Sequence, residues 1–366
     1  MLQEIIRPCY LWLVLMLFSL SACDLIEELI GESKRGKGHD ESDRHVQLSL
    51  AVAHHIAWMP WYYADQEGIL SENSVRHQLE VQFIKDDYQN LIESFLNDEV
   101  QAIVISNIAA IAQLVRRDIE SDVILITNDS SGNEAILLPE QANAKVHELP
   151  GKSFALVKYS TRHYLLDRYL IRNQVPIEEI KIINIAETDV LNAFLNKEIY
   201  GVVSRNPYLY KLTHQDPAAK ILFDSRQIPK EIFDLLVVRR ETLIDYPKFA
   251  QVLLATWFSV MERLQGSKKG PTMDAMAGLA GLSRQELDEQ LITTPLNDTP
   301  TKALSAIRDR RIRKTMRHIR YFIDRYELSG SELFNESISY PGRTPALLHF
   351  NGQPLQDFVM PALTKK

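Results

Sequence analysis

Cysteine is nearly absent from this chain of 366 residues. Cys9 and Cys23 are the only two, and both precede residue 24, so the rest of the chain contains no thiol. A fold built from the later residues therefore does not depend on disulfides, and an oxidising compartment would not alter it. The same scarcity excludes a cysteine nucleophile and a thiolate metal site beyond residue 24.

Several sequence motifs of catalysis are also missing. The chain has no Gly-x-Ser-x-Gly elbow, no His-Glu-x-x-His and no phosphate-binding P-loop, and its carboxylates form no recognisable pair. A net charge of -7 argues against general nucleic-acid binding. We therefore expect neither an enzyme nor a nucleic-acid-binding protein, and no cofactor. A hydrolase or a pyrimidine-synthesising enzyme stays open as an alternative, which turnover by the purified protein would reveal.

The N-terminus contains no apolar run long enough to span a membrane as a mature helix. Arg7 precedes an apolar run of about nine residues, and small residues follow, which is the pattern of a secretory signal peptide over residues 1–22. Leu20-Ser-Ala-Cys23 resembles the lipobox of bacterial lipoproteins. That resemblance implies cleavage before Cys23 and diacylglycerol on its sulfur. The alternatives are a plain signal peptide with a chance cysteine, or an uncleaved anchor.

Residues 23–45 are predicted to be a lipidated N-terminus followed by a flexible linker. Their mixture of small and charged residues cannot bury enough apolar surface to fold alone. Lipid anchoring would place the protein at the periplasmic face of the inner membrane, or at the outer face of the cell membrane. Asp24, next to the predicted lipidation position, resembles a signal for inner-membrane retention.

From Val46 onward, apolar runs typical of strands alternate with segments of helical periodicity. The predicted strands are residues 46–53, 79–84, 102–105, 123–127, 135–138, 153–157, 180–185, 202–204, 221–223 and 233–238. The predicted helices among them are residues 60–66, 88–96, 107–115, 162–172, 189–195 and 207–212. This alternation predicts an α/β protein with mainly parallel, doubly wound sheets.

Two polar segments, residues 128–133 and 224–230, look like crossovers between two lobes. They predict a first lobe of residues 46–128 plus 231–366, and a second lobe of residues 129–230. The C-terminal region is predicted to be helical at residues 246–265, 273–280, 284–291 and 301–326, with a loop-like tail beyond Gly330. Ser283 and Glu286 have the spacing of a capping box. Two lobes joined twice predict a ligand cleft between them.

A resemblance to a known family lies in residues 58–70, 149–157, 160–166 and 187–195, followed by 201–208, and covers roughly residues 46 to 265. Together these stretches resemble the extracytoplasmic substrate-binding proteins of ABC importers. The nearest subfamily includes binders of nitrate, taurine, alkanesulfonates and the pyrimidine precursors of thiamine synthesis. The resemblance implies a type II periplasmic-binding-protein-like fold, in which two lobes close on a small solute. The partners it implies are that solute and an ABC permease, and we expect a monomer.

The solute-binding residues are predicted where strands end and helices begin, because ligands of α/β proteins bind there. They are His55, Trp58, Ser106, Asn107, Asp129, Ser160, Thr161, His163, Glu187, Arg205 and Asn206. The start of the 160–172 segment would present free backbone N–H groups to an anion. Arg205 would form paired hydrogen bonds to a carboxylate, sulfonate or phosphate. We therefore expect an anionic or zwitterionic organic solute.

Several of these residues also have a purely structural interpretation. Ser160 would only cap its helix while Arg162 faces water, and Arg205 would be a rim residue paired with Glu187 or Asp189. Ser106 and Asn107 would cap a helix, Asp129 would be a turn residue, and Trp58 would pack in the core. His54 and His55 are adjacent in an extended segment and so point to opposite faces, which makes them a poor metal chelate.

Residues 308–320 form the most basic stretch of the chain. In a functional interpretation, this stretch contacts anionic lipid, a transporter or a sensor. In a structural interpretation, it is a solvated helix face with Ile312, Met316 and Ile319 turned inward. The tail beyond Tyr326 suggests a second function, a ligand-sensing subunit that docks on a membrane sensor kinase or cyclase. Capture of a kinase or cyclase in place of a permease would distinguish this alternative from solute import.

Overall fold

The computed structural model describes residues 47–142, 145–195, 199–326 and 337–363. The predicted signal peptide, the lipidation position Cys23 and the linker lie outside these residues. Residues Val46–Lys366 form one compact unit. Within the described ranges, no helix combines the length and the apolar character that a membrane crossing requires.

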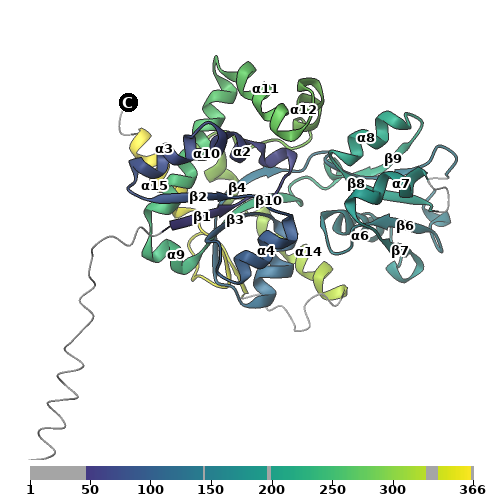
Figure 1. Ribbon diagram of the computed structural model, residues 1–366. Coiled ribbons are helices and arrows are strands. Elements are labelled where there is room, and N and C mark those ends of the chain that lie inside the picture. Colours follow the sequence, from purple (N-terminus) through teal and green to yellow (C-terminus); the bar gives the residue numbers. More distant parts are fainter. Residues whose placement is uncertain (1–46, 143–144, 196–198, 327–336, 364–366) are drawn as a thin grey trace, which may run out of the picture. The chain divides into compact units, whose positions relative to one another are not determined.

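Two β-sheets organise this unit (Figure 1). The seven-stranded sheet has the order β11-β12-β4-β10-β3-β1-β2, and the five-stranded sheet has the order β7-β6-β8-β5-β9. We call each sheet with its helices a lobe, the seven-stranded one being the first. Its strands are β1 (Gln47–Ala51), β2 (Glu80–Ile84), β3 (Ala102–Ser106), β4 (Ser121–Asp129), β10 (Phe233–Arg239), β11 (Ile338–Ser339) and β12 (Leu348–Phe350). The second lobe has β5 (Glu134–Leu138), β6 (Ser153–Leu156), β7 (Lys181–Asn184), β8 (Gly201–Arg205) and β9 (Lys220–Asp224).

Helices cover both faces of each sheet. In the first lobe they are η1 (Ile56–Trp58), α2 (Met59–Gln66), α3 (Ile69–Arg76), α4 (Tyr88–Leu96), α5 (Asn107–Ala109), η2 (Ala110–Leu114), η3 (Val115–Arg117), α9 (Arg240–Asp245), α10 (Lys248–Gln265), α11 (Lys269–Ala280), α12 (Arg284–Leu291), α13 (Pro300–Ile307), α14 (Arg311–Arg325) and α15 (Gln353–Leu363). In the second lobe they are η4 (Val146–Glu148), α6 (Thr161–Arg172), η5 (Ile177–Glu179), η6 (Glu187–Asp189), α7 (Val190–Leu195), α8 (Tyr208–Gln215) and η7 (Ser225–Gln227).

The pairing of strands is parallel except at two strands. β10 runs antiparallel to both β3 and β4, and β5 runs antiparallel to both β8 and β9. The chain crosses from the first lobe into β5, and it returns to the first lobe through β10. Each of these strands enters its sheet directly after a crossover, so the two crossovers explain the two exceptions.

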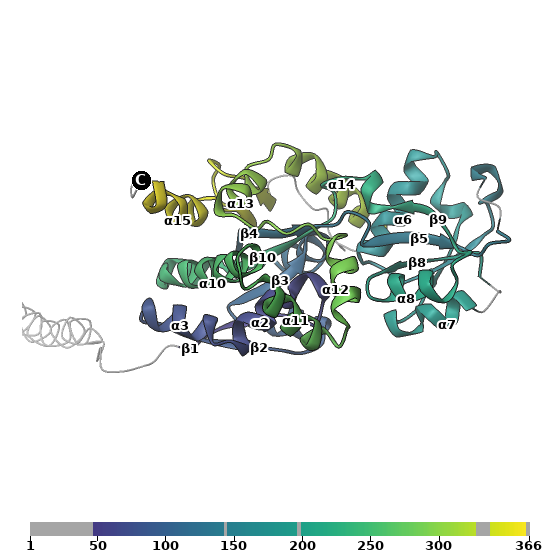
Figure 2. The same cartoon turned by 90° about the horizontal axis from the view of Figure 1, so that it is seen from above.

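Period-two alternation in the second sheet distributes its side chains between two apolar clusters. Ile136, Leu138, Phe154 and Leu156 belong to the same cluster as the apolar residues of α6. Their sequence neighbours, such as Leu137 and Ala155, join the apolar residues of α7 and α8. Figure 2 shows α6 on one side of this sheet and α7 and α8 on the other.

The predicted long helix over residues 301–326 is wrong, because two helices, α13 and α14, occupy this segment. The break falls at the polar residues Arg308, Asp309 and Arg310. Asp309 Oδ1 accepts a hydrogen bond from the Arg311 backbone N–H at 2.9 Å, and Asp309 also pairs with the Arg311 guanidinium. A carboxylate that satisfies the first free N–H groups favours a new helix start at this point.

The prediction of a loop-like tail beyond Gly330 is also wrong. β12 pairs with β4 and extends the first sheet, and Leu348, Phe350 and Leu355 are fully buried. Asp122 of β4 binds this segment through Asn351 Nδ2 at 2.8 Å. The sensor function was suggested by a tail that looked like an addition to the two lobes. The described residues of this tail instead belong to the core of the first lobe.

Other predictions of local structure are confirmed. Ser283 and Glu286 form the capping box of α12, whose bounds match the prediction. Ile312, Met316 and Ile319 are buried on α14, as the solvated-face interpretation expects. Gly68 follows the end of α2 with a φ of 70°, and the chain then continues directly into α3, a helix that the sequence patterns did not reveal.

Candidate functional site

A charged triad lies where three elements of the second lobe meet. Arg162 is in the first turn of α6, Glu187 begins η6, and Arg205 ends β8. Glu187 Oε2 is 2.8 Å from Arg162 Nη2 and 3.4 Å from Arg205 Nε. The Arg162 side chain is 7% exposed, so the interpretation in which it faces water is wrong. One carboxylate thus lies between two guanidiniums, and the buried Glu134, opposite Arg205 in the β5–β8 pair, adds a second negative charge nearby.

Burial and mutual attraction act in opposite directions on these groups. Burial lowers the pKa of Arg162 to about 10, which still leaves it protonated at neutral pH. Burial alone would raise the pKa of Glu187, but the charges of Arg162 and Arg205 lower it below its usual value. The triad is therefore fully ionised at neutral pH.

An aromatic and polar cluster occupies the corresponding position in the first lobe. The ring of His55 lies 5.1 Å from that of Trp58, which in turn lies 5.6 Å from that of Tyr88. Trp58 Nε1 donates to Asp234 Oδ2 at 2.9 Å, and Asn128 Nδ2 donates to the same oxygen at 3.0 Å. Trp58 thus packs in the core, as its structural interpretation expects, and also fixes a buried carboxylate.

The two clusters face one another across the lobes. Burial lowers the pKa of His55 well below 6.5, and the positive charges of Arg205 and Arg162 lower it further. Burial raises the pKa of Asp234 to about 6, while Arg205 partly offsets that shift. A neutral imidazole, an aromatic pair and a buried carboxylate therefore lie within electrostatic range of the two arginines. Sequence reasoning missed Tyr88 and Asp234, although an acidic residue inside an apolar strand was a usable signal.

Several polar atoms in these clusters are buried and have no hydrogen-bond partner among the described residues. They are Nδ1 and Nε2 of His55, Nε of Arg162 and Oε1 of Glu187. Buried polar atoms are nearly always paired, because an unmade hydrogen bond costs about 1–3 kcal/mol. A solute with acceptors for the arginine and a donor for the carboxylate would satisfy them. This combination suits a ligand that carries both signs of charge.

The neighbouring histidines separate as extended backbone geometry predicts. His54 is exposed, and its Nε2 lies 3.1 Å from the Leu279 carbonyl oxygen, whereas His55 is buried beside Trp58. Their rings consequently belong to different environments.

The side chains at the start of α6 have two different roles. Ser160 is the N-cap and accepts from the Arg162 backbone N–H at 3.2 Å, and its hydroxyl donates to the Val157 carbonyl at 2.6 Å. Thr161 is buried, and its Oγ1 accepts from Arg162 Nη1 at 3.4 Å. Ser160 thus has the capping role of its structural interpretation, while Thr161 supports a member of the triad.

His163 lies among aromatic residues at the C-terminal end of α14. Its ring is 5.1 Å from that of Phe322 and 4.1 Å from that of Tyr326. The Tyr159 backbone N–H donates to Nδ1 at 3.2 Å, and burial lowers the pKa of His163 to about 3. The structure therefore groups His163 with the contact between α6 and α14, not with the charged triad.

Ser106 ends β3 and Asn107 begins α5, next to the first-lobe cluster. Ser106 Oγ accepts from the Ala109 backbone N–H at 3.3 Å, and the Ser106 backbone N–H donates to the hydroxyl of Tyr88 at 3.1 Å. Asn107 is fully buried and donates to the Glu231 carbonyl at 3.0 Å. Ser106 therefore touches the cluster, whereas Asn107 holds the chain segment that returns from the second lobe.

Asp129 and Asn206 make contacts near the crossovers. Asp129 forms an ion pair with Lys230 from the other crossover. Asn206 Nδ2 donates to Thr293 Oγ1 at 3.0 Å, which links the second lobe to the segment after α12. These two residues connect the lobes.

Of the predicted residues, the structure brings together His55, Trp58, Ser106, Thr161, Glu187 and Arg205 around the facing clusters.

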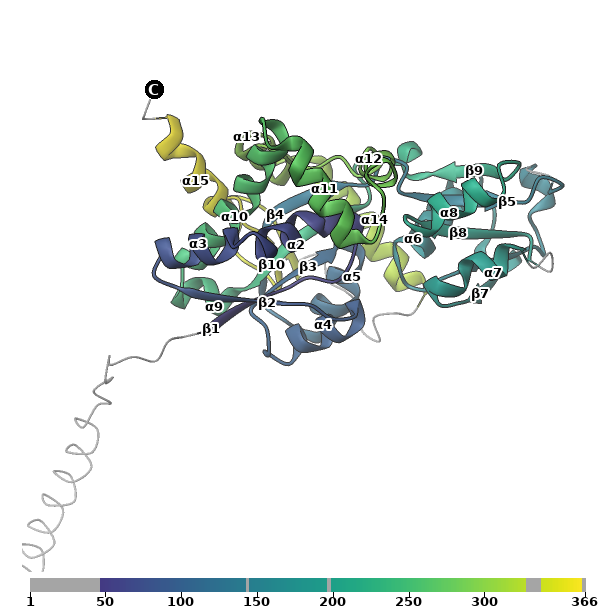
Figure 3. The same ribbon diagram turned by 45° about the horizontal axis from the view of Figure 1, so that its top comes forward.

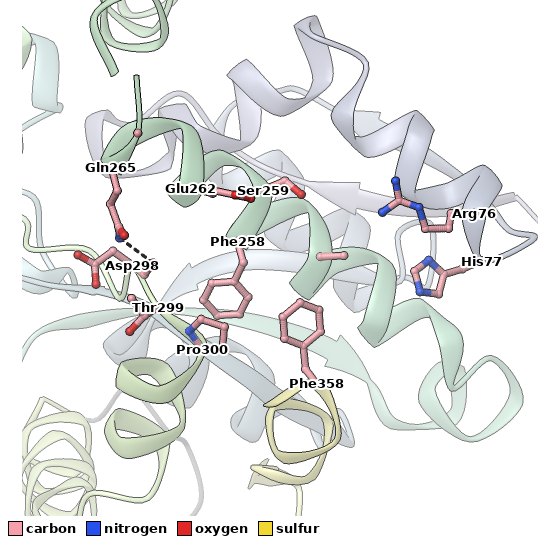
Figure 4. Close-up of a pocket in the computed structure, with 12 residues that line it drawn as sticks. Arg76, His77, Phe258, Ser259, Glu262, Gln265, Asp298, Thr299, Pro300 and Phe358 are labelled. Atoms are coloured by element: carbon pink, nitrogen blue, oxygen red, sulfur yellow. Dashed lines mark hydrogen bonds between the residues drawn. The ribbon is translucent and has the colours of Figure 1, made fainter. Parts of the chain in front are cut away.

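A separate open groove of about 690 Å³ lies on the first lobe between α3, α10, α13 and α15. Figure 4 shows Phe258 and Phe358 in this groove, with Arg76 and His77 at the end of α3. The two phenylalanine rings are 5.4 Å apart. None of the predicted solute-binding residues lines the groove, so the facing clusters remain the candidate site.

Comparisons with solved structures identify the fold. The periplasmic aliphatic sulphonate binding protein SsuA of Escherichia coli superimposes with a TM-score of 0.66 at 16% identity, over 78% of this chain and 89% of that one. The alkanesulfonate-binding protein SsuA of Xanthomonas axonopodis pv. citri, bound to MOPS, gives 0.63 at 16% identity, over 80% and 96%. A Candida albicans protein described as having the generic periplasmic binding protein fold gives 0.55 at 14% identity, over 78% and 90%.

The chain has the fold of a periplasmic binding protein. The predicted fold class, a two-lobed α/β protein of this kind, is thereby confirmed. No protein-family model and no curated protein sequence matches the chain. Sequence identities of this size establish the fold alone, so the solute has to be argued from the residues of the site.

Proposed function

We propose that this protein is an extracytoplasmic solute-binding protein of an ABC importer. It captures a small organic solute that carries an anionic group, between the triad of Arg162, Glu187 and Arg205 and the cluster around His55. Proteins of this fold work by hinged closure of their lobes around a ligand. The observation that carries the proposal is the closeness of two buried arginines to an aromatic cluster, with buried polar atoms on both sides that have no partner among the described residues.

The chemistry of the two clusters favours a zwitterion over a simple anion. Arg162 and Arg205 supply donors to a carboxylate, sulfonate or phosphate, and Arg205 keeps its positive charge because Glu187 offsets the effect of burial on its pKa. Glu187 Oε1 is buried without a partner among the described residues and would accept from an ammonium group of the solute. Trp58 and Tyr88 supply an apolar surface for the carbon skeleton of the solute. Binding is the whole activity that these residues support, and no catalytic step is proposed.

The localisation of the protein is part of the same proposal. Lipid on Cys23 would hold the protein at the periplasmic face of the inner membrane or the outer face of the cell membrane, and residues 24–45 would act as a tether. The monomer would then release its solute to a permease in the same membrane.

The first test measures solute binding by the purified full chain. Taurine and other amino-sulfonates, amino acids, alkanesulfonates, simple carboxylates and amines are screened by thermal shift, and hits are confirmed by calorimetry. We expect a zwitterionic or anionic solute to raise the melting temperature. Arg205→Gln should weaken its binding at least 30-fold, because a charge-assisted hydrogen bond in a desolvated site is worth about 2 kcal/mol or more.

The matched control is Arg226→Gln, since Arg226 is an exposed arginine of the same lobe that pairs with Asp224. This variant should bind the solute as the wild type does. Equal weakening by both substitutions, or a preference for uncharged or purely cationic solutes, would contradict the proposed site. If the solute-bound protein captures a sensor kinase or cyclase but no permease, the function is sensing and not import.

A further inference from the structure

The exposed face of α14 is strongly basic. Arg310, the residue before the helix, and Arg313, Lys314 and Arg317 within it are all exposed, and their spacing places them on one side of the helix. The opposite side buries the apolar residues Ile312, Met316, Ile319, Phe322 and Ile323. We call the four exposed cations the α14 basic face. They span eight residues, or about 10 Å along the helix axis.

Some cations elsewhere in the described residues have acidic partners. Lys85 pairs with Asp65 at 2.8 Å, and Arg284 pairs with Asp274 at 2.9 Å and with Asp288 at 2.8 Å. By contrast, no described acidic residue forms an ion pair with any member of the α14 basic face. The neighbouring Asp309 pairs with Arg311 instead. Only Arg313 has a close aromatic contact, 5.2 Å from the ring centroid of Tyr340.

This local charge is opposite to that of the whole chain, which has a net charge of -7. Within α14, the only large side chain with an exposed apolar part is Tyr321, which is 52% exposed. A specific protein interface is normally built around an apolar centre, and the α14 basic face has none. A cationic surface with an aromatic residue beside it suits the headgroup region of an anionic bilayer better.

We propose that the α14 basic face binds the surface of a membrane that contains anionic lipids. Phosphate groups of the lipids provide the negative counter-charges to these four cations, with which no described acidic residue forms an ion pair. The inference relies on the proposed function only for its setting, in which the tether keeps the protein beside a membrane. A flexible tether of about 20 residues has a mean extension of about 25 Å, so the helix would meet lipid at high local concentration.

The test uses residues 46–366, because they form one compact unit with a core of their own. This choice removes the lipid anchor from the measurement. Flotation with vesicles of phosphatidylglycerol and phosphatidylcholine should recover the protein at low ionic strength, and vesicles of phosphatidylcholine alone should not. The double variant Arg313→Gln/Arg317→Gln should lower the partition coefficient about 25-fold, since each cation near such a surface is worth about fivefold. Salt at 0.5 M should abolish the wild-type binding.

The control variant Arg226→Gln/Arg284→Gln removes the same total charge from acid-paired positions outside α14. It should keep wild-type partitioning within a factor of two. An equal loss in both variants, or binding to neutral vesicles, would overturn the proposal, as would binding of the basic face to an acidic protein domain but not to vesicles. Solute binding by Arg313→Gln/Arg317→Gln should be unchanged. A failure of the membrane-binding proposal would therefore show in the vesicle assay, and a failure of the solute-site proposal would show in the solute-binding assay.

Discussion

At the scale of single residues, Asp234 is the least expected member of the site. It is the second residue of the central strand β10, is 8% exposed, and accepts from Trp58 and Asn128 on one oxygen. Burial disfavours its charged form, which is why its pKa rises to about 6. Ionisable groups with such shifted pKa values are concentrated at functional sites. We therefore include Asp234 with Glu187 as a candidate acceptor for a cationic group of the solute.

This pKa shift predicts a pH-dependent stability. The raised native pKa means that, between about pH 4 and pH 6, the native state binds more protons than the unfolded state. The free energy of unfolding therefore falls as the pH rises through this window. Asp234→Asn keeps an acceptor oxygen and removes the titration. Relative to the wild type, the variant should gain about 3 kcal/mol between pH 3.5 and pH 7, measured by urea unfolding. A stability difference that does not change with pH would contradict the assignment.

The adjacent residues Arg162 and His163 show how sensitive a site is to helix geometry. Successive residues of a helix point about 100° apart. Arg162 consequently joins the triad with Glu187, while His163 packs against Phe322 and Tyr326. The sequence located the start of this helix correctly, but the choice of which side chain faces the first lobe depends on its rotation about its own axis.

At the scale of elements, α6 and α14 form a contact that crosses from one lobe to the other (Figure 3). Glu231, in the returning crossover, accepts from Arg168 Nε at 2.6 Å and from the Tyr164 hydroxyl at 2.8 Å, both on α6. His318 of α14 lies 3.7 Å from the same carboxylate, and Arg325 pairs with Asp167. The helix that contributes Arg162 to the site is thus fixed to the crossover on its other side.

The Glu231 contact predicts a measurable loss of stability. Burial alone would raise the pKa of Glu231, but hydrogen bonds and the charge of Arg168 lower it. Glu231→Gln leaves the largely buried Arg168 without its counter-charge, which should reduce the free energy of unfolding by about 2–3 kcal/mol. Glu241→Gln is the matched control, because Glu241 is 65% exposed, and it should change stability by less than about 0.5 kcal/mol. Denaturant unfolding measures both, and equal effects would argue against a structural role for the crossover contact.

At the scale of the whole molecule, the proposed tether predicts how the chain is processed. Cys23→Ala should abolish labelling of the protein with radioactive palmitate in a bacterial host and release it from the membrane fraction, because the acylated sulfur is lost. Cys9→Ala is the natural control, since Cys9 lies inside the predicted signal peptide. Labelling that survives Cys23→Ala, or that disappears with Cys9→Ala, would be incompatible with the lipoprotein proposal.

Local patterns in the sequence were sufficient for the α/β class, the two crossovers and most strands. Buried strands are continuous apolar runs, as in β3, and helix starts have recognisable caps, as at Ser160 and Ser283. These features depend on residues close together in the chain. The contact between Arg205 and Glu187 was also among the structural alternatives that the sequence suggested, whereas their role in solute binding stays a prediction.

Only the tertiary structure decided which of these residues meet. The division of residues 301–326 into two helices depends on the Asp309 carboxylate, and the burial of the tail depends on an open edge at β4, about 220 positions earlier in the chain. Tyr88 and Asp234 became part of the site through contacts with Ser106 and Trp58 that no local pattern encodes. Sequence periodicity specifies which face of an element is apolar, whereas packing between elements fixes the rotation and neighbours of each polar side chain, and a binding site consists of those neighbours.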